Sequence, residues 1–300
     1  MTYSTLITVA QLQALQASSA PLQVWDCSFD LMQPAAGAQA FEQVHIAGAR
    51  YVNLDTDLSD KTGAADAASG GRHPLPSRAK FAAWLSAAGV TPATQVVVVD
   101  RNGCNYCGRA WWMLQWCGHS AVAVLDGGLQ AWQAAGGAMG GAQTSGFSSL
   151  GASSTDLGAV LASNRPVVHV STAQAAINFV VDAVRAQSHT IIDARAAPRY
   201  RGEVEPLDAV AGHIPGALNR PFQQNFDANG FFKPAAQLRA EFDALLAGRD
   251  AGKVIHHCGS GVSAVPNVLA MAIAGYPPSQ LFAGSWSEWS RRADLPMAQG

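Results

Sequence analysis

The chain alternates short apolar runs with longer amphipathic segments. Val96–Val99 and Val254–Ile255 are two β-branched runs of the kind that forms buried strands. Amphipathic segments such as Ala79–Ala88, Ala110–Trp116 and Ala235–Ala247 stand between the apolar runs and predict helices. Strands that alternate with helices indicate a parallel sheet with helices on both faces. We therefore predict an α/β protein.

The landmarks of this pattern occur twice in the same order, which predicts a duplicated fold. In each half an apolar run ends in aspartate and is followed by a His-Ile-x-Gly-Ala motif, Asp26 before His45 and Asp193 before His213. A β-branched run and a glycine-tryptophan motif complete each half, at 96–99 and 127–132 and again at 254–255 and 284–289. We expect two domains, 1–137 and 165–300, joined by a linker at 138–164 that is rich in Gly, Ser and Ala.

Composition narrows the class of protein. The 300 residues are 49% hydrophobic, which is enough for two cores, and 19 basic against 21 acidic residues give a net charge of −2. This balance leaves no electrostatic footprint for nucleic acid and favours a small substrate or a protein partner. No apolar run approaches the roughly 20 residues that cross a bilayer, and the start of the chain lacks the basic region of a signal peptide. With an odd count of five cysteines, we expect a cytoplasmic protein without disulfides or membrane contact.

Cys258 is the strongest candidate for a reactive residue. It follows the 254–257 run and precedes Gly259-Ser260-Gly261 and an apolar, helix-like stretch. A strand that turns through small residues into a helix aims backbone N–H groups and a helix N-terminus at one point, where an anion is stabilised. A thiolate, the reactive form of cysteine, is favoured there.

Three other interpretations of this loop are possible from the residues alone. Residues 259–264 fit the G-x-G-x-x-A form of a dinucleotide fingerprint, but the nearest later acid is Glu288, in a tryptophan-rich segment that does not suit the ribose. A cysteine phosphatase would need an arginine where Ala264 stands. A buried structural cysteine would not explain the glycine and serine residues around Cys258.

The paired Asp…His-Ile-x-Gly-Ala landmarks, the Cys258 loop and the ending Gly284-Ser285-Trp286 together resemble a two-domain rhodanese-type sulfurtransferase over nearly the whole chain. The resemblance implies two tandem rhodanese-like domains of one α/β fold, of which only the second forms a persulfide. Asp100 occupies the position in the first half that Cys258 occupies in the second. A carboxylate cannot carry sulfane sulfur, so the first domain is expected to be non-catalytic.

The loop after the cysteine is similar to that of 3-mercaptopyruvate sulfurtransferases, which resemble Cys-Gly-Ser-Gly-Val-Thr, rather than to the Cys-Arg-Lys-Gly-Val-Thr loop of thiosulfate-preferring members. Thiosulfate is a compact dianion that gains from cations in the loop, whereas this loop has none. The departure Val265-Pro266 places proline in a first helical turn, where it is tolerated, so we expect the helix to persist. The residues that the resemblance places around the donor are Gly259, Ser260, Gly261, Val262 and Ser263.

The same resemblance supplies partners for the donor carboxylate. Arg195 matches a family stretch whose arginines bind the substrate anion, and guanidinium offers the bidentate geometry that a carboxylate accepts. Arg199 and Arg201 belong to the same stretch, although a solvated loop balanced by Glu203 and Glu205 explains them equally well.

A histidine relay is implied as well. His73 matches a histidine that mercaptopyruvate enzymes turn toward the cleft, and Arg72 beside it adds positive charge. The implied relay joins His73 to Ser260 and to Asp55 or Asp57, while the alternative is a structural histidine. The Cys104-x-x-Cys107 pair lies in neither a zinc-site nor a thioredoxin-like context.

The predicted reaction is nucleophilic. Cys258 attacks the sulfur of 3-mercaptopyruvate, pyruvate leaves as its enolate, and the Ser260/His73 pair delivers a proton. The persulfide passes its outer sulfur to cyanide or to a thiol such as thioredoxin, and no cofactor is needed. A thiosulfate:cyanide sulfurtransferase is the nearer alternative, and a non-catalytic sulfur carrier or binding module is the more distant one.

Overall fold

The computed structural model describes residues 2–141 and 173–300, which form two compact units. Unit 1 comprises the described residues of 1–58, 77–168 and 229–231, and unit 2 those of 59–76, 169–228 and 232–300. Residues 59–76 therefore belong to unit 2, although they lie in the first half of the sequence. Most of the predicted linker, residues 142–164, lies outside the described residues.

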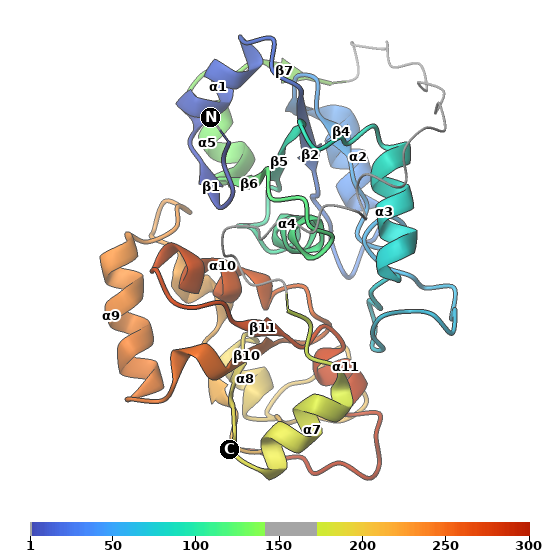
Figure 1. The fold of residues 1–300 in the computed structure, drawn as a ribbon, viewed down its shortest axis with the longest axis vertical. Coiled ribbons are helices and arrows are strands. Elements are labelled where there is room, and N and C mark those ends of the chain that lie inside the picture. Colours follow the sequence, from blue (N-terminus) through green and yellow to red (C-terminus); the bar gives the residue numbers. More distant parts are fainter. Residues whose placement is uncertain (1, 142–172) are drawn as a thin grey trace. The chain divides into compact units, whose positions relative to one another are not determined.

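Unit 1 is built on a five-stranded parallel sheet in the order β1-β6-β5-β2-β4 (Figure 1). The strands are β1 (Leu6–Ile7), β2 (Leu22–Asp26), β4 (Arg50–Tyr51), β5 (Gln95–Val99) and β6 (Val122–Leu125). A separate antiparallel pair joins β3 (His45–Ile46) to β7 (Met139–Gly140). Every residue of β5 is buried, as expected of a central parallel strand covered on both faces.

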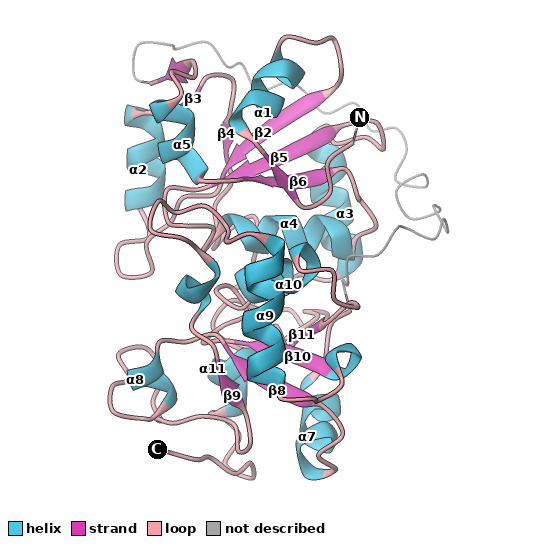
Figure 2. Ribbon diagram, turned by 90° about the vertical axis from the view of Figure 1, so that its left-hand side faces the viewer, coloured by secondary structure: helices cyan, strands magenta, loops and turns pink. Residues whose placement is uncertain are grey.

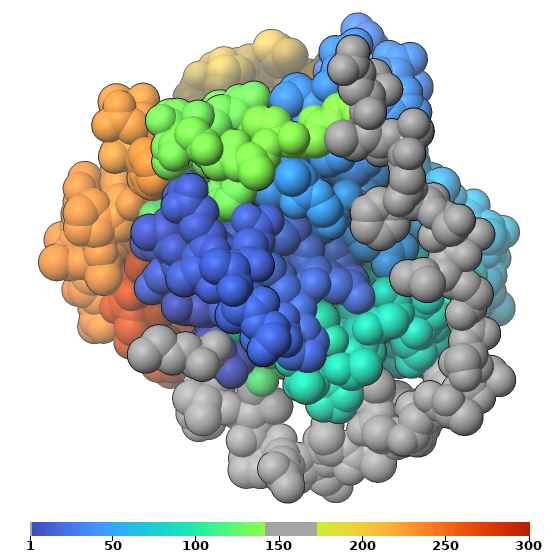
Figure 3. Space-filling view, turned by 90° about the horizontal axis from the view of Figure 1, so that it is seen from above, coloured from blue at the N-terminus to red at the C-terminus, as the bar shows by residue number. Residues whose placement is uncertain are grey.

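Helices cover both faces of this sheet because successive strand side chains point in opposite directions. Val24 and Val97 face a core that includes Leu12 and Trp132, whereas Trp25 contacts Trp84 on the other face, with ring centroids 5.4 Å apart. The helices are α1 (Val9–Gln16), α2 (Ala36–Gln43), α3 (Arg78–Ala87), α4 (Cys107–Trp116) and α5 (Gly128–Ala134). Figure 3 shows the N-terminal segment (dark blue) beside the α5–β7 segment (bright green) on one face of this unit.

Unit 2 has a four-stranded parallel sheet in the order β11-β10-β8-β9 (Figure 2). The strands are β8 (Thr190–Asp193), β9 (Leu218–Asn219), β10 (Val254–His257) and β11 (Gln280–Leu281). The helices are α7 (Ile177–Arg185), α8 (Ala197–Tyr200), α9 (Ala235–Leu246), α10 (Val265–Ile273) and α11 (Ser285–Trp289), with short 3-10 turns at Phe222–Asn225 and Ala251–Lys253.

The two faces of the second sheet are also covered. Ile191 and Ile255 pack in one core with Val180 of α7 and Trp286 of α11. His256 points to the opposite face, where its Nε2 lies 3.2 Å from Met271 Sδ of α10. Both units thus have the predicted architecture, a parallel sheet with helices on both faces.

The predicted helices are confirmed within a few residues, since α3, α4 and α9 cover the amphipathic segments. The helix after the cysteine loop also persists, with Pro266 in its first turn. Within residues 2–141 and 173–300, no helix combines the length and the apolar character that crossing a membrane requires.

Candidate active site

Cys258 opens the loop 258–264, which connects the end of β10 to the start of α10 (Figure 1). Its side chain is buried, and its backbone is fixed on both sides by the start of α11. The Cys258 N–H donates to Ser285 Oγ at 3.1 Å, and the Cys258 carbonyl accepts from the Trp286 N–H at 3.0 Å. The next carbonyl, of Gly259, accepts from the Ser287 N–H at 2.9 Å. These bonds hold the Cys258 backbone in one position.

Gly261 lets the loop pass close to the neighbouring strand end. Its φ of +73° lies in the left-handed region, and an added methyl group would stand 2.2 Å from the Ala283 carbonyl oxygen. A residue with a Cβ would therefore displace this backbone, so the predicted donor-loop glycine is required for the loop's shape.

The segment 59–76 packs against the start of α11. Gly71 has a φ of +88°, and a methyl group there would stand 2.5 Å from the Gly284 carbonyl oxygen. The Arg72 N–H donates to Ser287 Oγ at 2.9 Å. These contacts orient His73, whose Nδ1 lies 2.7 Å from Ser260 Oγ. Both side chains of this hydrogen bond are buried, so the predicted Ser260/His73 pair is brought together two residues after Cys258.

Two guanidinium groups stand over the loop at Gly259. A methyl group built on Gly259 would lie 3.1 Å from Arg72 Nη2 and 3.4 Å from Arg199 Nη1. Arg72 is also held by Asp208, with Nη1 to Oδ1 at 2.6 Å, and Arg199 by Glu205, with Nη2 to Oε1 at 2.6 Å. The structure thus places two cations beside a loop that has no charge of its own.

Arg195 has a different environment. It is buried, and its Nη2 donates both to Asp193 Oδ2 and to the Gly212 carbonyl, each at 2.7 Å. Its Nη1 donates to Glu205 Oε2 at 3.3 Å, and its guanidinium lies over the Trp286 ring at 4.9 Å. Most of its donors are therefore engaged within the protein.

Asp193, the buried partner of Arg195, is also close to His257. His257 Nε2 lies 3.6 Å from Asp193 Oδ2, on the side away from His256. Burial alone raises the pKa of Asp193, but His257 and Arg195 lower it below its ordinary value. Burial lowers the pKa of His256 to about 3, with a smaller contribution from His257 in the same direction. His256 is thus neutral near pH 7 and packs against α10.

The remaining predicted residues are more dispersed. Arg201 pairs with Glu203 at 2.6 Å on the surface, where both side chains are more than 40% exposed. Asp55 and Asp57 belong to unit 1, where Asp57 Oδ2 accepts from the Asn53 N–H at 2.7 Å. Val262 is buried in the cysteine loop, and Ser263 is partly exposed there.

Sequence reasoning missed the carboxylates that hold the two arginines. The sequence gives no signal that distinguishes Asp208, and it predicts Glu205 only as a balancing charge in a solvated loop. The structure buries both, with side chains 5% and 4% exposed. Their signal was weak, since it consisted only of acids close in sequence to Arg199.

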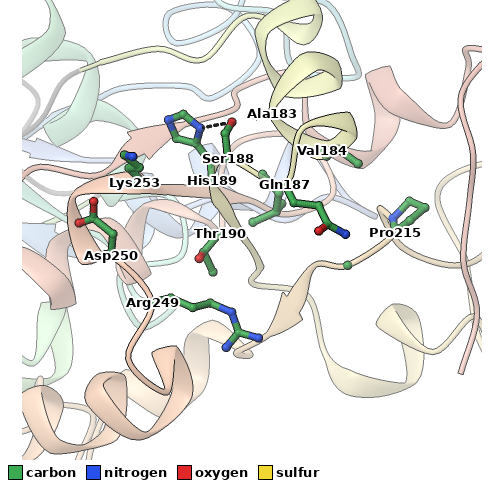
Figure 4. Close-up of a pocket in the computed structure, with 12 residues that line it drawn as sticks. Ala183, Val184, Gln187, Ser188, His189, Thr190, Pro215, Arg249, Asp250 and Lys253 are labelled. Atoms are coloured by element: carbon green, nitrogen blue, oxygen red, sulfur yellow. Dashed lines mark hydrogen bonds between the residues drawn. The ribbon is translucent and has the colours of Figure 1, made fainter.

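A separate cavity of about 600 Å³ lies at the amino ends of β8 and β10. Figure 4 shows its polar lining, in which Ser188 Oγ contacts His189 Nδ1 at 3.0 Å and Arg249 and Lys253 stand near Asp250. Because Cys258 follows the carboxyl end of β10, this cavity is on the opposite edge of the sheet from the cysteine loop.

Unit 1 contains a loop of the same length at the matching position. Asp100 follows β5 as Cys258 follows β10, and α4 begins seven residues later, as α10 does. The buried Asp100 carboxylate accepts four backbone N–H groups at 2.8 to 2.9 Å, from Asn102, Cys104, Tyr106 and Cys107. The Cys104/Cys107 pair thus supplies backbone donors to a carboxylate.

Comparison with known proteins agrees with this duplicated architecture. A family model described as a rhodanese-like domain matches the chain twice, at residues 8–135 and 179–292. The chain belongs to the rhodanese family. The two matches contain Asp100 and Cys258, respectively, each followed by its loop and helix.

Relatives that match nearly the whole chain are named for one of two sulfur donors, 3-mercaptopyruvate or thiosulfate. A protein of Pseudomonas aeruginosa named as a probable 3-mercaptopyruvate sulfurtransferase is 41% identical over 100% of both chains. A protein of Mycobacterium tuberculosis named as a putative thiosulfate sulfurtransferase, SseB, is 40% identical over 98% of this chain and 97% of its own. The crystal structure of SseA from Escherichia coli, described as a 3-mercaptopyruvate sulfotransferase, matches 94% of this chain and 99% of its own, with 29% identity and a TM-score of 0.73.

Proposed function

We propose that this protein is a 3-mercaptopyruvate sulfurtransferase that works through a persulfide on Cys258. The thiolate attacks the sulfur of the donor, the carbon–sulfur bond breaks, and its electron pair leaves with pyruvate as the enolate. An acceptor thiol or cyanide then removes the outer sulfur and restores Cys258. No cofactor takes part in these steps.

The hydrogen bond between Ser260 and His73 is the observation that carries the choice of donor. An enolate needs a proton on carbon to become pyruvate, and this pair stands two residues from the nucleophile, with its heavy atoms 2.7 Å apart. Sulfite, which leaves from thiosulfate, needs no such proton. A buried proton relay therefore serves mercaptopyruvate and is superfluous for thiosulfate.

The Asp100 loop supports a role for backbone N–H groups in holding the persulfide. In unit 1 these donors come from the second, fourth, sixth and seventh residues after the carboxylate. The first three correspond to Ser260, Val262 and Ala264, whereas the Val265 N–H donates to the Val262 carbonyl at 3.1 Å. We assign the three matching N–H groups to the anionic sulfur on Cys258.

We assign the donor carboxylate to Arg72 and Arg199, whose guanidinium groups stand over Gly259. Arg195 then acts as a positioning residue, because it ties Glu205, a partner of Arg199, to Asp193. Gly261 shapes the loop, and Ser263 is proposed to stand beside the donor, as the resemblance implies. Arg201 is proposed only as a peripheral charge, since it pairs with Glu203 at the surface.

The assignment of domains follows from the same residues. We propose that 1–137 is a rhodanese-like domain that forms no persulfide, with Asp100 in place of cysteine, that 138–164 is the linker, and that 165–300 is the catalytic domain. Within the first of these ranges, segment 59–76 belongs to unit 2 and brings His73 to Ser260, and the start of the linker forms β7. The physiological acceptor is proposed to be a small thiol or reduced thioredoxin in the cytoplasm, where a free thiol such as Cys258 stays reduced.

Intact-mass measurement after incubation with 3-mercaptopyruvate, without acceptor, tests the persulfide. Wild type should gain the mass of one sulfur atom and lose it when a thiol is added, whereas Cys258→Ser should gain nothing. Cys117→Ser is the matched control. Burial raises the pKa of Cys117 to about 11, against the opposing charge of Arg78, so this thiol is a poor nucleophile. Sulfur retained by Cys258→Ser would contradict the assignment.

Thiosulfate:cyanide sulfurtransfer is the second candidate, favoured by the two arginines that a dianion could use and by the name of the Mycobacterium tuberculosis relative. Side-by-side values of kcat/KM for the two donors separate the candidates, and we expect the larger value for 3-mercaptopyruvate. Multiple turnovers of either donor in this assay would exclude a non-catalytic sulfur carrier.

A further inference from the structure

Four charged side chains form a paired cluster beside the cysteine loop. Asp208 bridges the two arginines, with Oδ1 2.6 Å from Arg72 Nη1 and Oδ2 3.5 Å from Arg199 Nη2. Glu205 holds Arg199 from the other side at 2.6 Å. The two carboxylates are nearly inaccessible to solvent, so the pairs are screened far less than surface pairs are.

Each arginine uses different nitrogens for the carboxylate and for the loop. Arg72 binds Asp208 through Nη1 while its Nη2 faces Gly259, and Arg199 binds Glu205 through Nε and Nη2 while its Nη1 faces Gly259. Arg72 Nε is buried and has no hydrogen-bond partner within the described part of the chain. A bound carboxylate can therefore be added to these arginines without displacing Asp208 or Glu205.

The charges of this cluster cancel, since two guanidinium groups are balanced by two carboxylates and Gly259 and Ser260 contribute none. A singly charged donor meets two oriented guanidinium groups at short range. The second negative charge of a dianion meets the Asp208 carboxylate as well, and both arginines are already paired with carboxylates. Burial raises the pKa of the Asp208 carboxyl above its ordinary value, although Arg72 acts in the opposite direction. More negative charge near Asp208 is thus unfavourable.

We propose that Asp208 is a specificity-determining residue, which bridges Arg72 and Arg199 and sets the charge of the donor site to favour a singly charged 2-oxo acid over a dianion. This inference rests on the proposed function. Two features then discriminate between donors. One is the uncharged cysteine loop, and the other is the Asp208 carboxylate outside it.

Asp208→Asn tests the proposal by removing one charge and keeping the size of the side chain. The ratio of kcat/KM for 3-mercaptopyruvate to kcat/KM for thiosulfate should fall about tenfold, mostly through a lower KM for thiosulfate. Asp208→Glu, which keeps the charge, should leave the ratio near that of wild type. Both ratios are measured at one ionic strength, because salt weakens the effect.

Glu203→Gln is the matched control, since it removes a carboxylate from the same segment but from an exposed pair. It should leave the ratio unchanged. An equal loss for both donors in Asp208→Asn would show only a structural role and overturn the inference, as would an unchanged ratio. A wild type that transfers no sulfur from 3-mercaptopyruvate would instead overturn the proposed function, so the two failures are distinguishable.

A second measurement needs no variant. At matched ionic strength, pyruvate, a monoanion, should inhibit wild-type turnover of 3-mercaptopyruvate at lower concentration than sulfate, a dianion of thiosulfate's shape. Stronger inhibition by sulfate would overturn the inference even if Asp208→Asn fails to fold.

Discussion

The two halves of the chain place loops of the same length after different side chains. Asp100 in unit 1 and Cys258 in unit 2 each follow a central strand and each precede a helix by seven residues. Asp100 fills its loop with a buried carboxyl group that accepts four backbone N–H groups. Cys258 places a thiol at the matching position, and the proposed mechanism requires this thiol to be charged, to take up sulfur and to release it again.

The unit 1 loop shows that backbone N–H groups after a central strand can hold a buried acceptor. The unit 1 loop is an anion site made of backbone N–H groups, which lower the pKa of Asp100 against the larger opposite effect of burial. In unit 2 a loop of the same length follows Cys258, whose charge changes during the reaction in the proposed mechanism. The flanking residues differ accordingly, because Asn102 stands in unit 1 where unit 2 has Ser260 bonded to His73.

Removing the carboxylate from unit 1 should have the largest effect on stability. Asp100→Ala leaves four backbone N–H groups unpaired in a buried loop, and the free energy of unfolding should fall by about 3 kcal/mol. Urea unfolding followed by circular dichroism measures the loss. Asp100→Asn keeps one acceptor oxygen and should lose less. A loss below that of a typical surface substitution would contradict the anion-site interpretation.

Removing the hydroxyl from unit 2 should affect one donor and spare the other. In Ser260→Ala the relay to His73 is broken, so kcat for 3-mercaptopyruvate should fall about 100-fold. Turnover of thiosulfate, which releases sulfite without a proton, should change much less. Steady-state kinetics with both donors provide the measurement, and a parallel fall for both would assign Ser260 a structural role only.

The smallest expected effect is a contrast in pH dependence between buried carboxylates of the two units. Burial raises the pKa of Asp100 above 3.8 despite its N–H donors, so the stability advantage of wild type over Asp100→Asn should be greatest in acid and decline as pH rises. Burial also raises the pKa of Asp193, but His257 and Arg195 lower it below 3.8 overall. The advantage over Asp193→Asn should be complete at neutral pH and decline as pH falls below 3.8. Urea unfolding across this range tests both signs, and slopes of the same sign would be inconsistent with the two environments.

The elements that position the cysteine could be predicted from the sequence because their signals are local. Four consecutive valines in β5 and the apolar segment after Cys258 specify a strand and a helix through burial alone. The pairing of His73 with Ser260 came from a motif resemblance, not from residue pattern. Pro266 lies in the first turn of α10, as expected, because N–H groups in a first turn have no partner within the helix and proline loses no hydrogen bond there.

The charge partners could not be predicted, because nearness in sequence does not say which acids and arginines meet or whether they are buried. The ion pair from Arg72 to Asp208 spans 136 positions, and no local propensity encodes it. Arg195 shows the same limit, since the sequence reveals a cation but not that Asp193, Glu205 and Gly212 already occupy its donors. Sequence pattern identifies which residues can bind an anion, while tertiary packing decides which of them have donors left to do so.

The membership of segment 59–76 in unit 2 limits how far the two halves of the chain are independent. The half without the cysteine supplies the other unit with the segment that carries Arg72 and His73. The chain therefore cannot be cut between its two halves without dividing unit 2. A protein truncated to residues 165–300 would retain Cys258 but lack Arg72 and His73, two of the side chains assigned to its donor.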